Sequence, residues 1–88
     1  MSFVSTGEMT RKARREGYAV PAFNAENLEM AQAIIQAASR EGSPVILQTT
    51  LPTARYWGMD EAVAVTASLA QEAPVPVALH LDHSNSFD

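Results

Sequence analysis

The sequence contains no cysteine, which excludes disulfide bonds and thiolate metal sites. Any metal ion must therefore be held by histidine, aspartate or glutamate. Long apolar runs are also missing: none approaches the roughly 20 residues that cross a bilayer, and residues 1–10 lack the apolar core of a signal peptide. We therefore expect no membrane partner and a cytoplasmic location.

Basic residues are scarce, with 6 Lys and Arg against 10 Asp and Glu and a formal net charge of −4. Binding to a phosphate backbone needs a basic excess, so we expect no nucleic-acid partner. The small basic cluster at residues 11–15 is interpreted as the solvated face of a helix. With 88 residues, 47% of them hydrophobic, the chain has room for one small globular domain.

Helix signals alternate with apolar runs along the chain. The Ser5-x-x-Glu8 capping box predicts a first helix at residues 6–15, ended by Gly17. A second helix opens at Asn24 or at residues 26–27 and stops at Gly42. A third is capped by Asp60 and reaches about Gln71. The apolar spacing predicts that the second helix buries Leu28, Ala31, Ile35 and Ala38, and that the third buries Val63, Ala64, Ala67 and Ala70.

Three short apolar runs, residues 18–23, 44–49 and 74–82, are predicted to be strands. They are apolar at successive positions, which is typical of parallel strands covered on both faces. Strand starts at Tyr18, Pro44 and Pro76 are 26 and 32 residues apart. An eight-unit barrel has about 31 residues per unit. A doubly wound sheet has similar spacing, so the spacing alone does not choose between the two folds. No G-x-G-x-x-G follows the first strand, which argues against a dinucleotide-binding doubly wound sheet.

Polar residues follow each apolar run: Asn24 after the first, Gln48 and Thr50 at the second, and Asp82-His83 at the third. In a parallel barrel these strand ends meet at the active-site face. From the residues alone, however, commoner roles stay open. Asn24 is also a typical helix cap, Gln48 and Thr50 are ordinary loop residues, and the histidines with Asp82 could form a hydrogen-bonded structural cluster.

Three segments together resemble a known family. They are Tyr-Ala-Val-Pro-Ala-Phe-Asn at 18–24, Ser-Pro-Val-Ile-Leu-Gln at 43–48 and Val-Ala-Leu-His-Leu-Asp-His at 77–83. In order and spacing they are similar to the first three strands of class II fructose- and tagatose-bisphosphate aldolases. The resemblance implies an α/β fold made of the N-terminal three βα units of a truncated (β/α)8 TIM barrel. Residues 1–88 would be an incomplete part of that single domain.

What the resemblance implies chemically is zinc-dependent aldol cleavage, and its reverse, in the full-length form. A ketose 1,6-bisphosphate, fructose or tagatose, would give dihydroxyacetone phosphate and glyceraldehyde 3-phosphate. His83 matches the first of three histidine ligands for Zn²⁺, and Asp82 matches the catalytic acid/base carboxylate. The H-L-D-H form leans toward the tagatose-type branch.

The same resemblance assigns the remaining site residues and partners. Asn24, Gln48 and Thr50 match substrate-binding positions, with Thr50 standing where the family often has serine. His80 would support the metal ligands from behind. A sugar bisphosphate is the expected small-molecule partner, and a homo-oligomer is expected at full length.

The 88 residues alone are expected to be inactive, because one matched zinc histidine cannot form a site that needs about three protein ligands. An alternative is a non-catalytic, aldolase-like accessory or partner-binding fragment. A small phosphate-binding protein of flavodoxin-like type fits the order of elements but not the motifs.

Overall fold

The computed structural model describes residues 3–50, 53, 55–56 and 58–82. Three helices and three strands are defined, and residues 53, 55 and 56, between the second strand and the last helix, are also helical. In chain order the elements are α1 (Thr6–Glu16), β1 (Ala22–Asn24), α2 (Leu28–Glu41), β2 (Val45–Thr50), α4 (Met59–Glu72) and β3 (Val77–Asp82).

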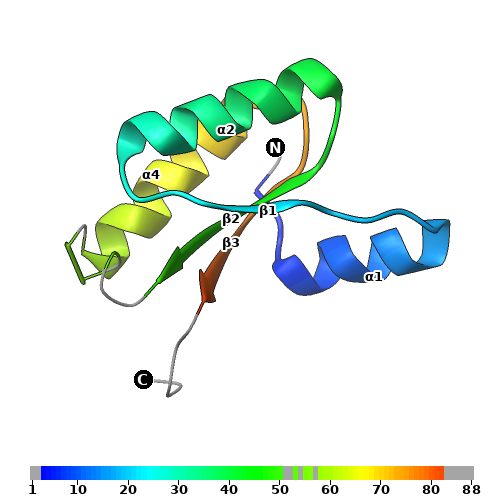
Figure 1. The fold of residues 1–88 in the computed structure, drawn as a ribbon, viewed down its shortest axis with the longest axis horizontal. Coiled ribbons are helices and arrows are strands. Elements are labelled where there is room, and N and C mark those ends of the chain that lie inside the picture. The colour runs from blue at the N-terminus through cyan, green and yellow to red at the C-terminus, as the bar shows by residue number, and fades with distance from the viewer. Residues whose placement is uncertain (1–2, 51–52, 54, 57, 83–88) are drawn as a thin grey trace.

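The three strands form one parallel sheet in the order β1-β2-β3. Figure 1 shows α2 and α4 together on one side of this sheet, and α1 on the other side near the start of the strands. This arrangement of parallel strands with intervening helices confirms the predicted α/β fold. Within the described ranges, no helix is long and apolar enough to span a membrane.

Apolar side chains pack against both faces of the sheet. On one face, Val45, Leu47 and Val77 join residues of α2 and α4 in the larger cluster. On the other face, Ile46 and Ala78 pack against Met9 of α1. The prediction that β2 is covered on both faces is therefore confirmed for its first three residues.

The predicted helix ends are largely correct. The Ser5 hydroxyl accepts a hydrogen bond from the Glu8 backbone N–H (3.1 Å), and Gly17 ends α1 at φ 77°. Asn27 caps α2 by accepting from the Met30 N–H (2.8 Å), and Gly42 ends it at φ 66°. A positive φ is cheap only for glycine, which explains both stop signals. The alternative that Asn24 caps α2 is wrong.

Strand β1 is shorter than predicted, because the residues before it either bond to α1 or lack an N–H group. The Tyr18 N–H donates to the Ala13 carbonyl (3.0 Å) and so completes the end of α1. Pro21 has no N–H, although its carbonyl accepts from Ile46 (2.9 Å). The strand comprises residues 22–24, so it includes only the last two residues of the predicted run 18–23 and continues through Asn24.

Prolines also delay the other two strands. β2 begins at Val45 rather than Pro44 and extends through Thr50. β3 begins at Val77, three residues into the predicted run 74–82 and directly after Pro76. Pro76 contributes only its carbonyl, which accepts from the Val45 N–H (3.1 Å).

Two predictions for α4 are wrong. The helix begins at Met59 after Gly58, so Asp60 lies in its first turn instead of capping it. A carboxylate there still interacts favourably with the helix dipole. Of the residues predicted to be buried, Ala70 is buried and Ala67 is half-buried, whereas Ala64 and Val63 (47%) are exposed. Ala62 and Thr66 are buried instead. In α2, Ala31, Ile35 and Ala38 are buried as predicted, but Leu28 is 43% exposed.

Candidate active site

The strand register brings the predicted site residues together in two rows. Asn24 pairs with Gln48, and Gln48 pairs with His80. Two residues further along, Thr50 pairs with Asp82. Side chains two apart on a strand share a face, and register partners in neighbouring strands do so as well. All five side chains therefore belong to the same face at the C-terminal ends of the strands.

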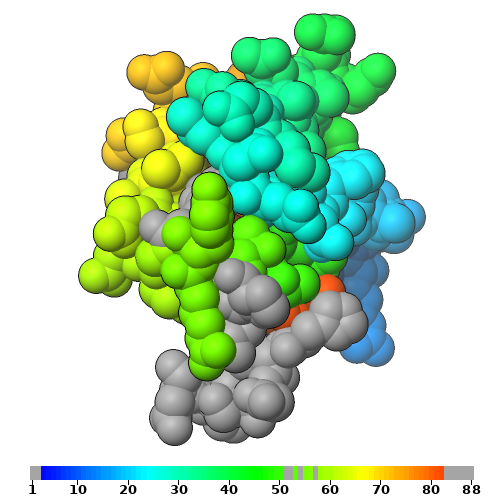
Figure 2. Space-filling model, turned by 60° about the vertical axis from the view of Figure 1, so that its left-hand side comes forward, coloured from blue at the N-terminus to red at the C-terminus, as the bar shows by residue number. Residues whose placement is uncertain are grey.

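Helix α1 determines which part of this face is open. Met9 packs on Ile46 and Ala78, which lie on the same face but nearer the strand starts. Beyond that contact, Asn24 and His80 are exposed, and Gln48, Thr50 and Asp82 are half-buried. In Figure 2 the ends of β2 (green) and β3 (orange-red) reach the surface next to each other. The polar half of the face is therefore accessible to a small molecule.

Asn24 and Gln48 are joined directly. The Gln48 Nε2 donates to the Asn24 Oδ1 at 3.2 Å, and the Gln48 backbone carbonyl accepts from the Ala25 N–H at 2.9 Å. The hydrogen bond thus fixes the orientation of both side-chain amides. The remaining amide donors and acceptors can then meet hydroxyl groups of a ligand in a fixed arrangement.

Thr50 has a partner that the sequence analysis missed. Its hydroxyl donates to the Thr53 Oγ1 at 3.3 Å. Thr53 has a helical backbone, outside the helices that the sequence predicts. The residue types at positions 50 and 53 give no signal for this contact, because two threonines three positions apart meet only in particular backbone conformations.

The described residues do not by themselves form a metal centre. Across residues 3–50, 53, 55–56 and 58–82, no three His, Cys, Asp or Glu residues lie close enough to hold a metal ion. The predicted ligand His83 lies outside the described residues. His80 and Asp82 lie on the same face of β3, and both side chains carry atoms that can bind a metal ion. The sequence holds two histidines in all, so a three-histidine site needs ligands from elsewhere.

A family model described as fructose-bisphosphate aldolase class-II matches residues 4–88. The chain belongs to this family. The membership agrees with the resemblance carried by the three strand segments. Class II aldolases are zinc-dependent enzymes, and this chain corresponds to the N-terminal portion of its relatives.

Curated relatives give the extent of the match. The chain is 48% identical over 91 aligned positions to a probable fructose-bisphosphate aldolase of Bacillus subtilis, covering 100% of this chain and 32% of that protein. It is 52% identical over 81 positions to the fructose-bisphosphate aldolase of Thermus caldophilus, covering 92% of this chain and 26% of that one. The chain therefore spans about a third or less of the relatives that it matches.

Solved structures agree with the fold. The YdjI aldolase of Escherichia coli K12 matches with a TM-score of 0.82 at 30% identity, over 97% of this chain and 33% of that one. A putative fructose-1,6-biphosphate aldolase of Coccidioides immitis matches with a TM-score of 0.75 at 32% identity, over 90% of this chain and 30% of that one. The class II aldolase segment thus has the expected three-strand beginning of the aldolase barrel.

Proposed function

We propose that residues 1–88 supply part of the active site of a class II aldolase that cleaves a ketose 1,6-bisphosphate. The products would be dihydroxyacetone phosphate and glyceraldehyde 3-phosphate, and fructose and tagatose bisphosphates are the two candidate substrates. The observation that carries the proposal is the common face shared by Asn24, Gln48, Thr50, His80 and Asp82 at three parallel strand ends. Family membership supports the reaction type.

The reaction needs a group that takes the proton from the C4 hydroxyl as the C3–C4 bond breaks. Asp82 is the carboxylate on the shared face, at the last position of β3. A carboxylate in that position acts as general base in cleavage and returns the proton in the reverse reaction. The bond electrons move toward the C2 oxygen, where negative charge develops.

Zinc, when bound, would stabilise that developing charge as a Lewis acid. His83 would be one of its ligands, and His80 of β3 would support that ligand from behind. The other two histidines and the phosphate-binding groups would come from polypeptide beyond these 88 residues. We therefore expect activity only when the rest of an aldolase barrel is supplied.

Substrate orientation would fall to the amides and the hydroxyl on the same face. The Gln48–Asn24 hydrogen bond leaves both side chains with groups that can bond to sugar hydroxyls. Thr50, held by Thr53, lies opposite Asp82 and would hold the substrate near the acid/base group. Orienting the reacting groups in this way lowers the entropic part of the barrier.

A chimera tests the proposal. Residues 1–88 are fused to the part of the Bacillus subtilis relative that follows its matching segment, and cleavage of fructose and tagatose 1,6-bisphosphates is measured. Asp82→Asn should lower kcat by about 10²–10⁴-fold, because the general base is removed without a change in size. The matched control is Asp60→Asn, an exposed carboxylate in the first turn of α4.

The control should keep kcat within about twofold of the unsubstituted chimera, since surface changes away from a site have little effect. An active chimera in which Asp82→Asn behaves like Asp60→Asn would contradict the catalytic role of Asp82. The ratio of kcat/KM for the two sugars decides between the two substrates.

A further inference from the structure

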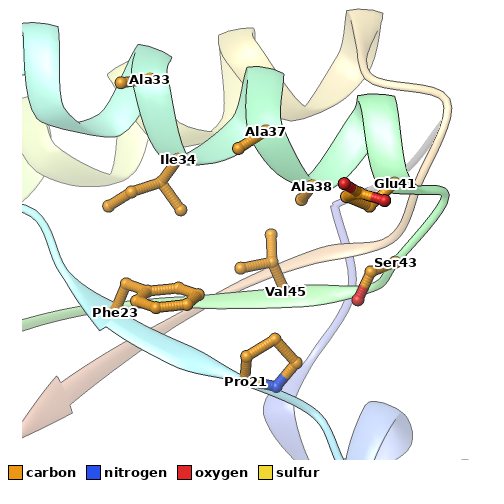
Figure 3. Close-up of a pocket in the computed structure, with 9 residues that line it drawn as sticks. All are labelled: Pro21, Phe23, Ala33, Ile34, Ala37, Ala38, Glu41, Ser43 and Val45. Carbon is orange, nitrogen blue, oxygen red and sulfur yellow. The ribbon is translucent and has the colours of Figure 1, made fainter.

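A groove and a small cavity border α2, and they differ in size and in lining. The groove, between α2 and β1, has a volume of about 460 Å³, and Figure 3 shows apolar side chains along it, among them Phe23, Ile34 and Val45. The cavity has a volume of about 10 Å³. That is close to the smallest space that can hold one water molecule. The cavity is therefore suited to a single water and to no larger ligand.

The cavity lies between β2 and the helices α2 and α4. Three alanines, Ala25, Ala31 and Ala62, line it with small side chains, and two further lining residues, Thr49 and Thr66, carry hydroxyl groups. The three alanines and Thr66 are buried. Waters inside proteins bind where a space of this size has several polar partners and is separated from bulk solvent. This cavity has both properties.

Thr66 is the more deeply placed of the two hydroxyl residues, with 2% of its surface exposed. A buried hydroxyl without a hydrogen bond is unfavourable. A helical threonine can meet this need by donating to the carbonyl four residues earlier, as Thr10 does to Thr6 at 2.9 Å. For Thr66, no hydrogen bond of the hydroxyl to any of the residues that the structure describes is found. Its hydroxyl therefore needs a polar partner in the cavity.

Thr49 lies on the strand side of the cavity. It shares a face of β2 with Leu47, which packs among residues of α2 and α4. The Thr49 hydroxyl donates to the Thr50 carbonyl at 3.4 Å, which is longer than the roughly 2.5–3.0 Å of an ordinary O–H···O bond. A hydroxyl oxygen also has two acceptor lone pairs. Thr49 can therefore accept a hydrogen bond from a water while it keeps its own weak bond.

We propose that one water molecule binds between Thr66 and Thr49 and joins α4 to the end of β2. The Thr66 hydroxyl donates to the water, and the water donates to the Thr49 hydroxyl. Gln48 also lines the cavity, and its carbonyl, which accepts from the Ala25 N–H at 2.9 Å, has a second lone pair for the water. This gives the water three partners, the usual number for a buried water.

The end of β2 is the part of the strand that such a bridge would hold in place. Residues 45–47 are buried, whereas residues 48–50 are half-buried. On the face of the candidate site, Met9 of α1 packs against Ile46 and not further along the strand. Gln48 and Thr50, on either side of Thr49, therefore depend on contacts on the helix side. Thr66 is thus a positioning residue for both side chains, and this role rests on the proposed function.

Nuclear magnetic resonance of the 88-residue chain tests the water site without any activity. Nuclear Overhauser contacts to a long-lived water should be seen from the methyl groups of Ala31 and Ala62, which line the cavity and have no exchangeable side-chain protons. Thr66→Val removes only the hydroxyl and should abolish these contacts. Thr66→Ser restores a hydroxyl and should restore them. The matched control is Thr10→Val, at an exposed threonine of α1, and should leave them unchanged.

Kinetics of the chimera test the positioning role. Thr66→Val should raise KM for the sugar bisphosphate about fivefold, the loss expected when substrate forfeits one uncharged hydrogen bond. The value of kcat should stay within about twofold, because Asp82 lies on β3 and is not touched. Thr66→Ser should bring KM back to within about twofold of the unsubstituted chimera, and Thr10→Val should not change it. A role in stability alone would not produce this pattern.

Two results would overturn the water site: no contact between water and the two alanine methyl groups in the unsubstituted chain, or the same contacts in Thr66→Val. Loss of the water in Thr66→Val with an unchanged KM would overturn the positioning role. An inactive chimera would count against the proposed function instead, and the resonance experiment would still decide whether the water binds.

Discussion

Asn24 and Asn27 are the same residue type three positions apart, and they have different partners. The Asn27 side chain accepts from the Met30 N–H and begins α2, whereas the Asn24 side chain accepts from Gln48 across the sheet. The first contact is local and belongs to helix formation. The second joins two strands on the face that carries the candidate site.

Alanine substitutions should separate these roles. Asn27→Ala should lower the free energy of unfolding by about 0.5–2 kcal/mol, because a helix N-terminal N–H loses its acceptor. Asn24→Ala, on an exposed strand end, should change it by no more than about 0.5 kcal/mol. Urea unfolding of the 88-residue chain, followed by circular dichroism, measures both.

In the active chimera the order should reverse. Asn24→Ala should raise KM roughly fivefold, since an uncharged hydrogen bond is worth about 1 kcal/mol. Asn27→Ala should leave KM unchanged. Equal effects of the two variants on both stability and KM would mean that Asn24 has no role in substrate binding.

At this scale the sequence was informative where one residue type has few alternatives. Ser5 begins α1 because its hydroxyl caps a helix N-terminus well. Gly17 and Gly42 end α1 and α2 because glycine is favoured where φ is positive. Which of Asn24 and Asn27 caps α2 could not be decided from composition, because asparagine is suited to both positions. The Thr50–Thr53 bond joins the last residue of β2 to a residue beyond the strand, and the two residue types gave no signal for it.

Strand β2 is the element on which the fold and the site both depend. Its first half is buried between α1 on one face and α2 with α4 on the other, and its second half carries Gln48 and Thr50. Leu47, at 1% exposure, is the largest side chain that is fully buried. The larger apolar cluster therefore depends on this one residue more than on any helix residue.

Leu47→Ala should cost about 2–5 kcal/mol, the range for a buried leucine that leaves a cavity. Because a chain of this size has a small stability margin, the variant should be largely unfolded without denaturant. Leu28→Ala is the matched control: Leu28 is 43% exposed and should cost less than about 1 kcal/mol. Near-UV circular dichroism and urea unfolding compare the two. A cooperative transition of unchanged midpoint in Leu47→Ala would contradict this account of the core.

The type and order of the helices and strands could be predicted from the sequence. The residue at which each strand begins, and the face of α4 that is buried, could not. Each strand starts later than its apolar run because Pro21, Pro44 and Pro76 have no N–H to give to the sheet. In α4 the alternation of alanine and valine gives no clear periodicity, so the helix turns Ala62 and Thr66 inward rather than Val63. Packing against α2 and the sheet determines that rotation, and the sequence of one helix does not contain it.

We expect zinc binding only when the rest of the barrel is supplied. The 88 residues hold two histidines, so the isolated chain should retain no zinc after dialysis. The chimera should retain about one zinc per chain, and a chelator should abolish its activity until zinc is restored. Elemental analysis and the cleavage assay check both statements. Stoichiometric zinc in the isolated chain would contradict the three-histidine site.

For the whole molecule, the repeat spacing predicted parallel strands but could not distinguish a barrel from a doubly wound sheet. Both architectures repeat at similar lengths, and a sheet of three parallel strands is compatible with either. The distinction came from the motifs at residues 18–24, 43–48 and 77–83, and the match to solved aldolases agrees with it. Chemistry at the strand ends was thus more diagnostic of architecture than any local structural signal.

The alternation along β2 has a consequence for how this segment can evolve. Leu47 faces the helices while Gln48 and Thr50 face the candidate site, so adjacent positions along the strand serve opposite faces. A deletion of one residue before Leu47 would exchange the two faces, burying an amide and exposing the core leucine. We therefore expect that lineages can exchange side chains here one at a time. They cannot change the length of the segment from Val45 to Thr50, so insertions and deletions should accumulate only in the connections outside it.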